Sequence, residues 1–266
     1  MSVREAQASQ AIKFLLPLLA LAAGIAIWEA VVRINDIPVY MLPAPSVIFA
    51  TLVQDWPVLF GSLLVTLSTT LQGFIAAAVG GIALAVLFSR SKWLEYALLP
   101  YAVILQVTPV IAIAPLLLIY LPQHLAVVVC AWIVAFFPVL SNTALGLNSV
   151  DRNLLGLFEM YGASRTQTLR YLKLPSALPH ILGGLRIAGG LSLIGAVVAE
   201  IAAGSAGAGS GLAYRISEAG YRLTIPRMFA ALLLLSIAGI VIYLGLSLVS
   251  HLVLRRWHES ALGKEK

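Results

Sequence analysis

Six apolar runs, each long enough to cross a lipid bilayer, constrain this sequence more than any other feature. A membrane-spanning helix needs about 20 mostly apolar residues to cross roughly 30 Å of hydrocarbon. The composition agrees, because the mean hydropathy is +0.98 and charged residues make up 11% of the chain, against about 25% in soluble proteins. We therefore predict an all-α, polytopic membrane protein with six transmembrane helices, at residues 12–32, 63–88, 94–121, 125–147, 181–203 and 228–254.

The basic residues are distributed unevenly between the segments that join these runs. Lys and Arg concentrate in the cytoplasmic loops of membrane proteins. If the N-terminus is cytoplasmic, the external segments hold only Arg33, Arg215, Arg222 and Arg227, and every other basic residue is cytoplasmic. This distribution predicts that both termini are cytoplasmic. The net charge of +6 is then explained by basic cytoplasmic loops and does not indicate nucleic-acid binding.

The polar segment 148–180, between the fourth and fifth runs, is a candidate docking surface. It is basic and strongly polar in a chain that is 61% hydrophobic. Ser164, followed three residues later by Gln167, matches a capping box, in which each residue bonds the backbone N–H of the other. We therefore predict that a helix begins at about Arg165.

Glycine and proline divide the rest of this segment. Gly162, directly before the predicted cap, suits a sharp turn between two short helices, because glycine tolerates positive φ at little steric cost. Pro175 is predicted to end the second helix, and Pro179 to direct the chain into the fifth span. The predicted order is helix, glycine turn, capped helix and proline stop.

The spacing of Gly162, nine further residues, and then Leu-Lys-Leu-Pro at 172–175 resembles the cytoplasmic loop of binding-protein-dependent ABC importer permeases. The family pattern is Glu-Ala-Ala, three residues, Gly, nine residues, Ile, any residue, Leu and Pro. The glycine and the Leu174-Pro175 pair match, whereas residues 156–158 are Gly-Leu-Phe and Leu172 replaces the Ile. The resemblance therefore covers the second half of the pattern better than the first.

Other segments extend the resemblance over most of the chain, from about Met41 to Leu254. They are similar to the branch of this family that imports nitrate, taurine, other sulfonates, thiamine-precursor pyrimidines or riboflavin, at residues 42–52, 107–121, 136–147 and 174–200. The resemblance implies a type I ABC importer permease fold. Residues 1–266 would then form a single transmembrane permease domain with a cytoplasmic coupling segment at 148–180.

The resemblance also implies the partners of the chain. Two permease copies would form the pore as a homodimer in the bacterial cytoplasmic (inner) membrane, a cytoplasmic ABC ATPase dimer would dock on the coupling segments, and an external solute-binding protein would deliver the solute. None of the five lysines lies in a G-x-x-x-x-G-K-[ST] context that could hold phosphates. We therefore expect a transport subunit rather than an enzyme, with no bound cofactor, while ATP and Mg bind the partner ATPase.

The coupling segment supplies the candidate ATPase-docking residues. An alternative remains open, in which the segment is an amphipathic helix on the bilayer surface with its basic residues near anionic lipid. For the docking interpretation, the candidates are Phe158, Glu159, Met160, Tyr161, Gly162, Ala163, Ser164, Arg165, Leu174 and Pro175.

Polar and aromatic residues within the predicted spans are candidates for the substrate path. Polar side chains in a span are costly and tend to face protein or water rather than lipid. Each has an ordinary alternative, a hydrogen bond between helices. Gln106 and Thr108 are favoured because the neighbouring Pro109 leaves a backbone carbonyl without its partner. The full set is Gln72, Gln106, Thr108, Trp132, Phe136, Asn142, Ser192 and Glu200.

Ionisable residues near the external ends of spans have two interpretations each. Glu200 is either part of an external gate or, in the ordinary interpretation, an interfacial anchor or an ion-pair partner of Arg215. Glu29 and Arg33, four residues apart, are predicted to form a local ion pair rather than a proton relay. In the external loop 204–227, we predict a short helix over residues 214–221.

Other function classes find less support in the sequence. An ion-coupled secondary transporter, the main alternative, would carry paired ionisable residues within the membrane, and only Glu29 and Glu200 approach this. No two histidines have the spacing of metal ligands, so we expect no metal site. The solute is predicted to be either a heterocycle, such as a pyrimidine, a thiamine precursor or riboflavin, or a small anion such as a sulfonate, taurine or nitrate.

Overall fold

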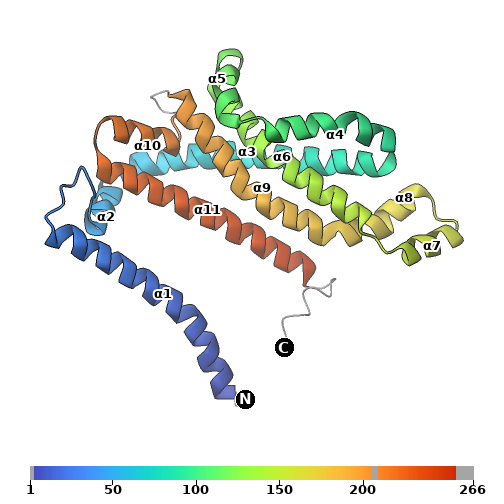
Figure 1. The fold of residues 1–266 in the computed structure, drawn as a ribbon, viewed down its shortest axis with the longest axis horizontal. Coiled ribbons are helices and arrows are strands. Elements are labelled where there is room, and N and C mark those ends of the chain that lie inside the picture. Colours follow the sequence, from blue (N-terminus) through green and yellow to red (C-terminus); the bar gives the residue numbers. More distant parts are fainter. Residues whose placement is uncertain (1–2, 205–208, 256–266) are drawn as a thin grey trace. The chain divides into compact units, whose positions relative to one another are not determined.

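The computed structural model describes residues 3–204 and 209–255, with the side chains of the first helix from Leu15 onward. Arg4, Lys13, Arg256, Lys264 and Lys266, which enter the predicted topology, lie outside the described side chains. Within the described residues the regular elements are all helical, as predicted (Figure 1). They are α1 (Val3–Ile34), α2 (Pro45–Gln54), α3 (Trp56–Arg90), α4 (Lys92–Val107), α5 (Val110–Tyr120), α6 (Gln123–Asn148), α7 (Arg152–Met160), α8 (Arg165–Thr168), the π-helical turn η1 (Leu169–Lys173), α9 (Leu174–Ala203), α10 (Leu212–Tyr221) and α11 (Ile225–Leu254).

Five helical stretches are long and apolar enough to cross a membrane, and a bent pair of helices makes a sixth span if the pair is counted as one. The bent pair, α4 and α5, corrects the prediction of one continuous helix over 94–121, because the two helices meet at an angle of 99°. Pro109 has no N–H to donate and disfavours a helical residue before it. Thr108 accordingly has an extended conformation, with φ −69° and ψ 123°.

The predicted stop at Pro175 is wrong. The chain stays helical from Arg165 to Ala203, through α8, η1 and α9. In η1 the Leu174 N–H bonds the Leu169 carbonyl, five residues back, directly before Pro175. The wider π-helical turn therefore lets the chain accommodate a residue that cannot donate a backbone hydrogen bond.

The chain divides into two compact units, one formed by residues 1–60 and 215–233 and the other by residues 61–214 and 234–266. In the first unit, Arg227 makes two hydrogen bonds to the Asp55 carboxylate, at 2.6 and 2.9 Å. Arg33 and Glu29 form the predicted local ion pair at 2.6 Å, and the same carboxylate accepts hydrogen bonds from Ser46. The Arg227–Asp55 ion pair and the Ser46–Glu29 hydrogen bonds therefore join segments of this unit that are distant in sequence.

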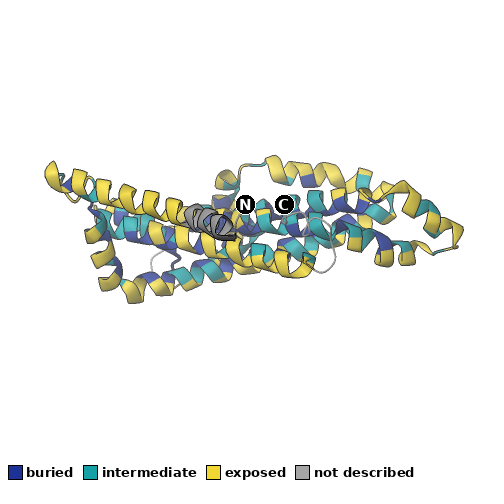
Figure 2. Cartoon of the chain, turned by 90° about the horizontal axis from the view of Figure 1, so that it is seen from below, coloured by how far each residue is buried: buried dark blue, intermediate teal, exposed yellow. Residues whose placement is uncertain are grey.

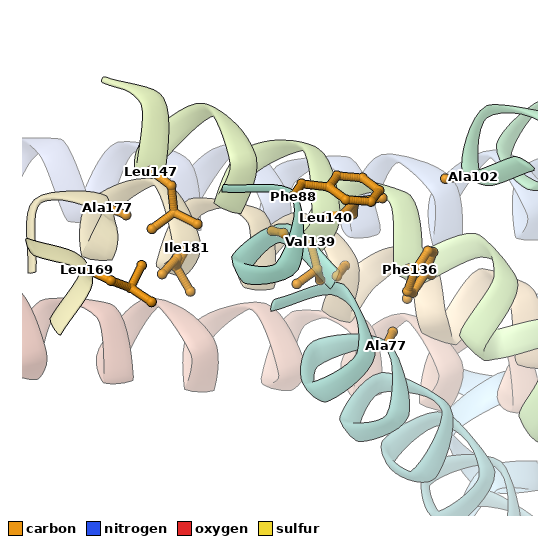
Figure 3. Packing of buried hydrophobic residues seen from close by; sticks show 13 residues of the cluster. Ala77, Phe88, Ala102, Phe136, Val139, Leu140, Leu147, Leu169, Ala177 and Ile181 are labelled. Atoms are coloured by element: carbon orange, nitrogen blue, oxygen red, sulfur yellow. The ribbon is translucent and has the colours of Figure 1, made fainter. Parts of the chain in front are cut away.

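The second unit is built around α6 and α9, its most extensively packed helix pair. Small residues let the two backbones approach closely, as is common in membrane helices. A Cβ added at Gly195 would lie 2.7 Å from the Cys130 carbonyl oxygen, so only glycine fits there. Figure 3 shows apolar side chains that meet around this pair, among them Phe136, Val139 and Ile181.

The exposed residues are typical of a protein that meets lipid. Figure 2 shows exposed positions along the length of the helices and not only at their ends. Many are large apolar residues, such as Leu64, Ile75 and Val79 of α3, whose exposed fractions range from 51% to 66%. In water these would form an unfavourable surface, whereas hydrocarbon accepts them.

Candidate functional site

The segment that resembles the family's coupling loop folds as two short helices joined at a tight turn (Figure 1). The Asp151 carboxylate caps α7, accepting a 2.8 Å hydrogen bond from the N–H two residues later. At the other end of α7, the Ala163 N–H bonds the Phe158 carbonyl and the Gly162 N–H bonds the Glu159 carbonyl, both at 3.0 Å. This pair of bonds is a Schellman motif with glycine in the left-handed conformation, at φ +68°.

The predicted capping box is confirmed. The Gln167 N–H donates to Ser164 Oγ at 3.3 Å, and the Ser164 N–H donates to Gln167 Oε1 at 2.7 Å. The helix begins at Arg165, as predicted. Leu169 and Leu172 are both buried in the unit, so the polar helix is anchored where it joins α9.

The candidate docking residues surround the turn. Met160 and Tyr161 are 85% and 83% exposed and lie at the turn between two polar helices. We call Met160, Tyr161 and Gly162 the turn tip. Of the other candidates, Glu159, Ser164, Arg165 and Pro175 are exposed, whereas Phe158, Ala163 and Leu174 are half-buried. An exposed apolar pair on a rigid turn is a typical contact surface for a protein partner.

A buried polar cluster lies at the other end of α9. Glu200 is 3% exposed, and its Oε2 accepts hydrogen bonds from Thr66 Oγ1 at 3.0 Å and from the Ala213 N–H at 3.1 Å. Thr66 Oγ1 in turn accepts a 2.8 Å hydrogen bond from the Leu212 N–H. The first N–H groups of α10 are therefore capped by side chains from α3 and α9 instead of by a residue of α10 itself.

Gly211, directly before α10, is part of the same cluster. A Cβ at this position would overlap the Glu200 carboxyl group. The absence of a side chain at Gly211 thus gives the carboxylate room to reach the backbone of α10. Arg215, which one alternative paired with Glu200, makes a 2.9 Å ion pair with Glu218.

A cavity of about 440 Å³ opens beside Glu200. His124, which lines it, lies 3.0 Å from the side-chain oxygen of Gln72. Two of the predicted path residues, Gln72 and Glu200, therefore lie near this cavity. Its other polar lining comes from Ser68, Thr69 and Gln123.

Two further predicted path residues lie at the break between α4 and α5. Gln106 and Thr108 line a cavity of about 390 Å³ together with Pro109 and Gly195. The Thr108 hydroxyl donates to the Ile104 carbonyl at 2.6 Å, and the Thr108 N–H donates to the same carbonyl at 3.0 Å. The break therefore produces a hollow with a mostly apolar lining, to which Gln106 and Thr108 contribute the polar side chains.

The remaining predicted path residues are separate from these two cavities. Trp132 and Phe136 contact each other, with ring centroids 5.1 Å apart. Ser192 donates a 2.8 Å hydrogen bond to the Thr70 carbonyl, and Asn142 donates to the carbonyl four residues before it at 2.8 Å. The Ser192 contact is a hydrogen bond between α9 and α3, which is the alternative to a position on the substrate path.

Thr66 was not among the sequence candidates, although the sequence carries a signal for it. Ser62, Thr66, Thr69 and Thr70 recur at helical spacing in α3, and all four are buried. Such a stripe on one face of an apolar helix indicates a contact with polar groups of another element.

Comparisons with known proteins agree with this geometry. A family model described as binding-protein-dependent transport system inner membrane component matches residues 77–259. The chain is 33% identical to the riboflavin transport system permease protein RibX of Chloroflexus aurantiacus, over 88% of this chain and 86% of the relative. It is also 33% identical to the formylaminopyrimidine transport permease protein ThiX of Halalkalibacterium halodurans, over 86% and 90% of the two chains.

The fold is also similar to that of a solved amino acid ABC transporter chain. The TM-score is 0.62 at 22% identity, and the match covers 78% of this chain and 98% of the other. The chain therefore belongs to the binding-protein-dependent transport system inner membrane components: it is a multi-pass permease subunit of an ABC importer for small solutes and not an enzyme, in a family that works with an ATPase and a substrate-binding protein.

Proposed function

We propose that this chain forms the translocation path of an ATP-driven importer and that its turn tip docks on a cytoplasmic ABC ATPase dimer. The observation that carries the proposal is the exposure of Met160 and Tyr161 on a turn held by a Schellman motif and a capping box. A surface of this kind stays fixed when a partner pushes against it, because its backbone hydrogen bonds are already made.

The helix that follows the turn could transmit such a push. Residues 165–203 form one helical stretch of 39 residues, which corresponds to about 58 Å at 1.5 Å per residue. Its first residue belongs to the docking surface, and Glu200 lies near its last turn. ATP and Mg would bind the ATPase, and closure of the ATPase dimer would displace the turn tips and, through these helices, the far ends of the spans.

We propose that two copies of the chain assemble around the path as a homodimer, with both termini in the cytoplasm. A permease chain with six spans most simply makes a two-fold assembly. Gln106 supports this proposal because it is exposed in the single chain, within a span. An exposed amide is costly against hydrocarbon, so a second copy or a water-filled path is its better environment.

For the solute, we propose a heterocyclic nutrient related to those that the names of RibX and ThiX give for these relatives. The cavity beside Glu200 is lined, within the described residues, by a carboxylate, an imidazole, an amide and hydroxyl groups, without Lys or Arg. These groups suit a neutral molecule that donates and accepts hydrogen bonds. Nitrate or a sulfonate would meet the Glu200 carboxylate, which carries the same sign of charge when it is ionised.

Reconstitution of the permease with its ATPase and solute-binding protein in proteoliposomes tests this proposal. We expect uptake of labelled solute that requires ATP, the ATPase and the binding protein together. Riboflavin and formylaminopyrimidine are the first solutes to test, with nitrate and taurine as the anionic comparison. Uptake that an ion gradient drives in the absence of the ATPase would identify a secondary transporter and overturn the proposal.

A further inference from the structure

A basic groove separates the end of α3 from the coupling segment. Its volume is about 350 Å³, and its lining includes Glu159, Ala163 and Arg165 of the candidate docking residues but no residue of the turn tip. Leu155 and Leu169 contribute an apolar part of its lining. The polar part consists of Ser89, Arg90, Glu159, Arg165, Thr168 and Lys173.

The three cations of this groove have no carboxylate partner. Among the described residues, Arg90, Arg165 and Lys173 form no ion pair within 4.0 Å, in contrast to the paired arginines of the first unit. The Arg90 guanidinium makes one long hydrogen bond, 3.5 Å to the Thr166 hydroxyl. With Glu159 as the one acidic lining residue, the groove keeps an excess of two positive charges.

Exposed aromatic residues close to Arg90 are typical of the level of the lipid headgroups. Arg90 is the last residue of the α3 span. Trp93 and Tyr96 follow directly and are 87% and 74% exposed. Exposed Trp and Tyr side chains at the end of a span mark the interface between hydrocarbon and water. These aromatic residues support a position of the cations near the phosphate groups of a bilayer.

We propose that the basic groove binds the phosphate group of an anionic phospholipid. Arg90, Arg165 and Lys173 would hold the phosphate oxygens, and Leu155 and Leu169 would contact the apolar part of the lipid near its headgroup. Basic pockets between membrane helices on the cytoplasmic side recognise anionic lipids in this way. The apolar lining favours a lipid over soluble phosphate, which has no apolar part to bury.

Such a lipid would connect two elements. Arg90 ends α3, whereas Glu159 and Arg165 belong to the coupling segment. A phosphate held between Arg90 and Arg165 would fix the coupling segment to the end of a neighbouring span. The proposal rests on the proposed function only in assigning this end of the chain to the cytoplasmic leaflet, and lipid binding can be measured on the permease alone.

The test compares binding of phosphatidylglycerol to the purified permease by native mass spectrometry and by titration in nanodiscs. The test variant is Arg90→Gln with Lys173→Gln. The control is Arg152→Gln with Arg170→Gln, which removes the same charge outside the groove. Each basic residue near an anionic surface contributes roughly fivefold, so we expect the test variant to bind about 25-fold more weakly. The control keeps the affinity of the unmodified protein.

Further control experiments identify the source of the phosphate and allow for a variant that does not fold. Phosphatidylethanolamine should not replace phosphatidylglycerol, and inorganic phosphate at millimolar concentration should not displace it. Equal loss of binding in the test and control variants, or displacement by inorganic phosphate, would overturn the proposal.

If the double variant does not fold, Arg90→Gln alone, at an exposed helix end, should still weaken binding about fivefold. Unchanged binding in that variant would also overturn it. ATPase docking and transport do not enter this measurement, so the proposed function can fail while lipid binding holds.

Discussion

Glu200 in α9 accepts a 3.0 Å hydrogen bond from Thr66 in α3, across 134 residues of sequence. Together the two side chains cap the N–H groups of Leu212 and Ala213 at the start of α10. The cluster is buried, so water cannot reach these polar groups and their hydrogen bonds must come from within the protein. It joins α3, α9 and the start of α10 at the end of α9 opposite the coupling segment.

The space at Gly211 is the first test of this cluster. Gly211→Ala would place a methyl group where the Glu200 carboxyl lies, so the carboxylate must move and release the N–H groups of α10. We expect a loss of about 1–3 kcal/mol in the free energy of unfolding, the range for overpacking a tight site. The measurement is thermal unfolding of the detergent-solubilised protein. Gly209→Ala, at a position with no atom within 4 Å of the added Cβ, is the matched control and should change little.

The Thr66 hydroxyl can be tested separately from packing. Thr66→Val keeps the shape of the side chain but leaves the Leu212 N–H and one Glu200 hydrogen bond without a partner. Buried groups that lose their partners cost about 1–3 kcal/mol, so we expect a lower melting temperature. Thr66→Ser should restore most of it because it keeps the hydroxyl. Equal melting temperatures for the Val and Ser variants would show that the hydrogen bonds do not matter.

Gly162 is predicted to be essential for coupling. Its φ of +68° is unfavourable for any residue with a Cβ, by about 1–2 kcal/mol for alanine and more for a β-branched residue. Gly162→Val should therefore distort the turn tip and lower ATP-driven uptake by roughly fivefold or more. Gly156→Ala is the control, because Gly156 lies within α7 and an added Cβ meets no atom within 4 Å. The same uptake in both variants would contradict the role of the turn.

The capping box should determine how firmly the coupling segment is held. Ser164→Ala removes the acceptor of the Gln167 N–H, at a cost of about 1 kcal/mol. We expect faster amide hydrogen exchange over residues 165–168 and little change in α6. Ser164→Asp retains an acceptor and should keep the exchange of the unmodified protein. Fast exchange in both variants would mean that another contact holds the helix.

Local features of this fold could be predicted from the sequence, whereas long-range ones could not. The Ser164–Gln167 cap and the Gly162 turn each depend on residues within a few positions of each other, and both predictions are confirmed. The hydrogen bond from Thr66 to Glu200 depends on how α3 and α9 pack. Sequence reasoning found Glu200 by its charge within a span but had no means of identifying its partner.

Pro109 and Pro175 show that local sequence rules do not fully predict where a helix ends. Pro109 and Pro175 both lack a backbone donor, and the first breaks its span by 99° whereas the second lies in a continuous helix. At Pro175 the buried Leu169 and Leu172 hold the preceding turn in place, and the π-helical hydrogen bond of Leu174 absorbs the irregularity. Tertiary packing therefore decides whether a proline ends a helix.

Co-purification of the ATPase with turn-tip variants shows whether Met160 and Tyr161 form the docking contact. Met160→Asp with Tyr161→Asp replaces the exposed apolar pair with charge, and Tyr221→Asp with Leu223→Asp makes the same change at exposed positions, 91% and 70% exposed, in and just after α10. We expect the turn-tip variant to lose the ATPase while the control retains it and both remain folded. Retention of the ATPase by the turn-tip variant, at the level of the control, would contradict the assignment of this turn as the coupling site.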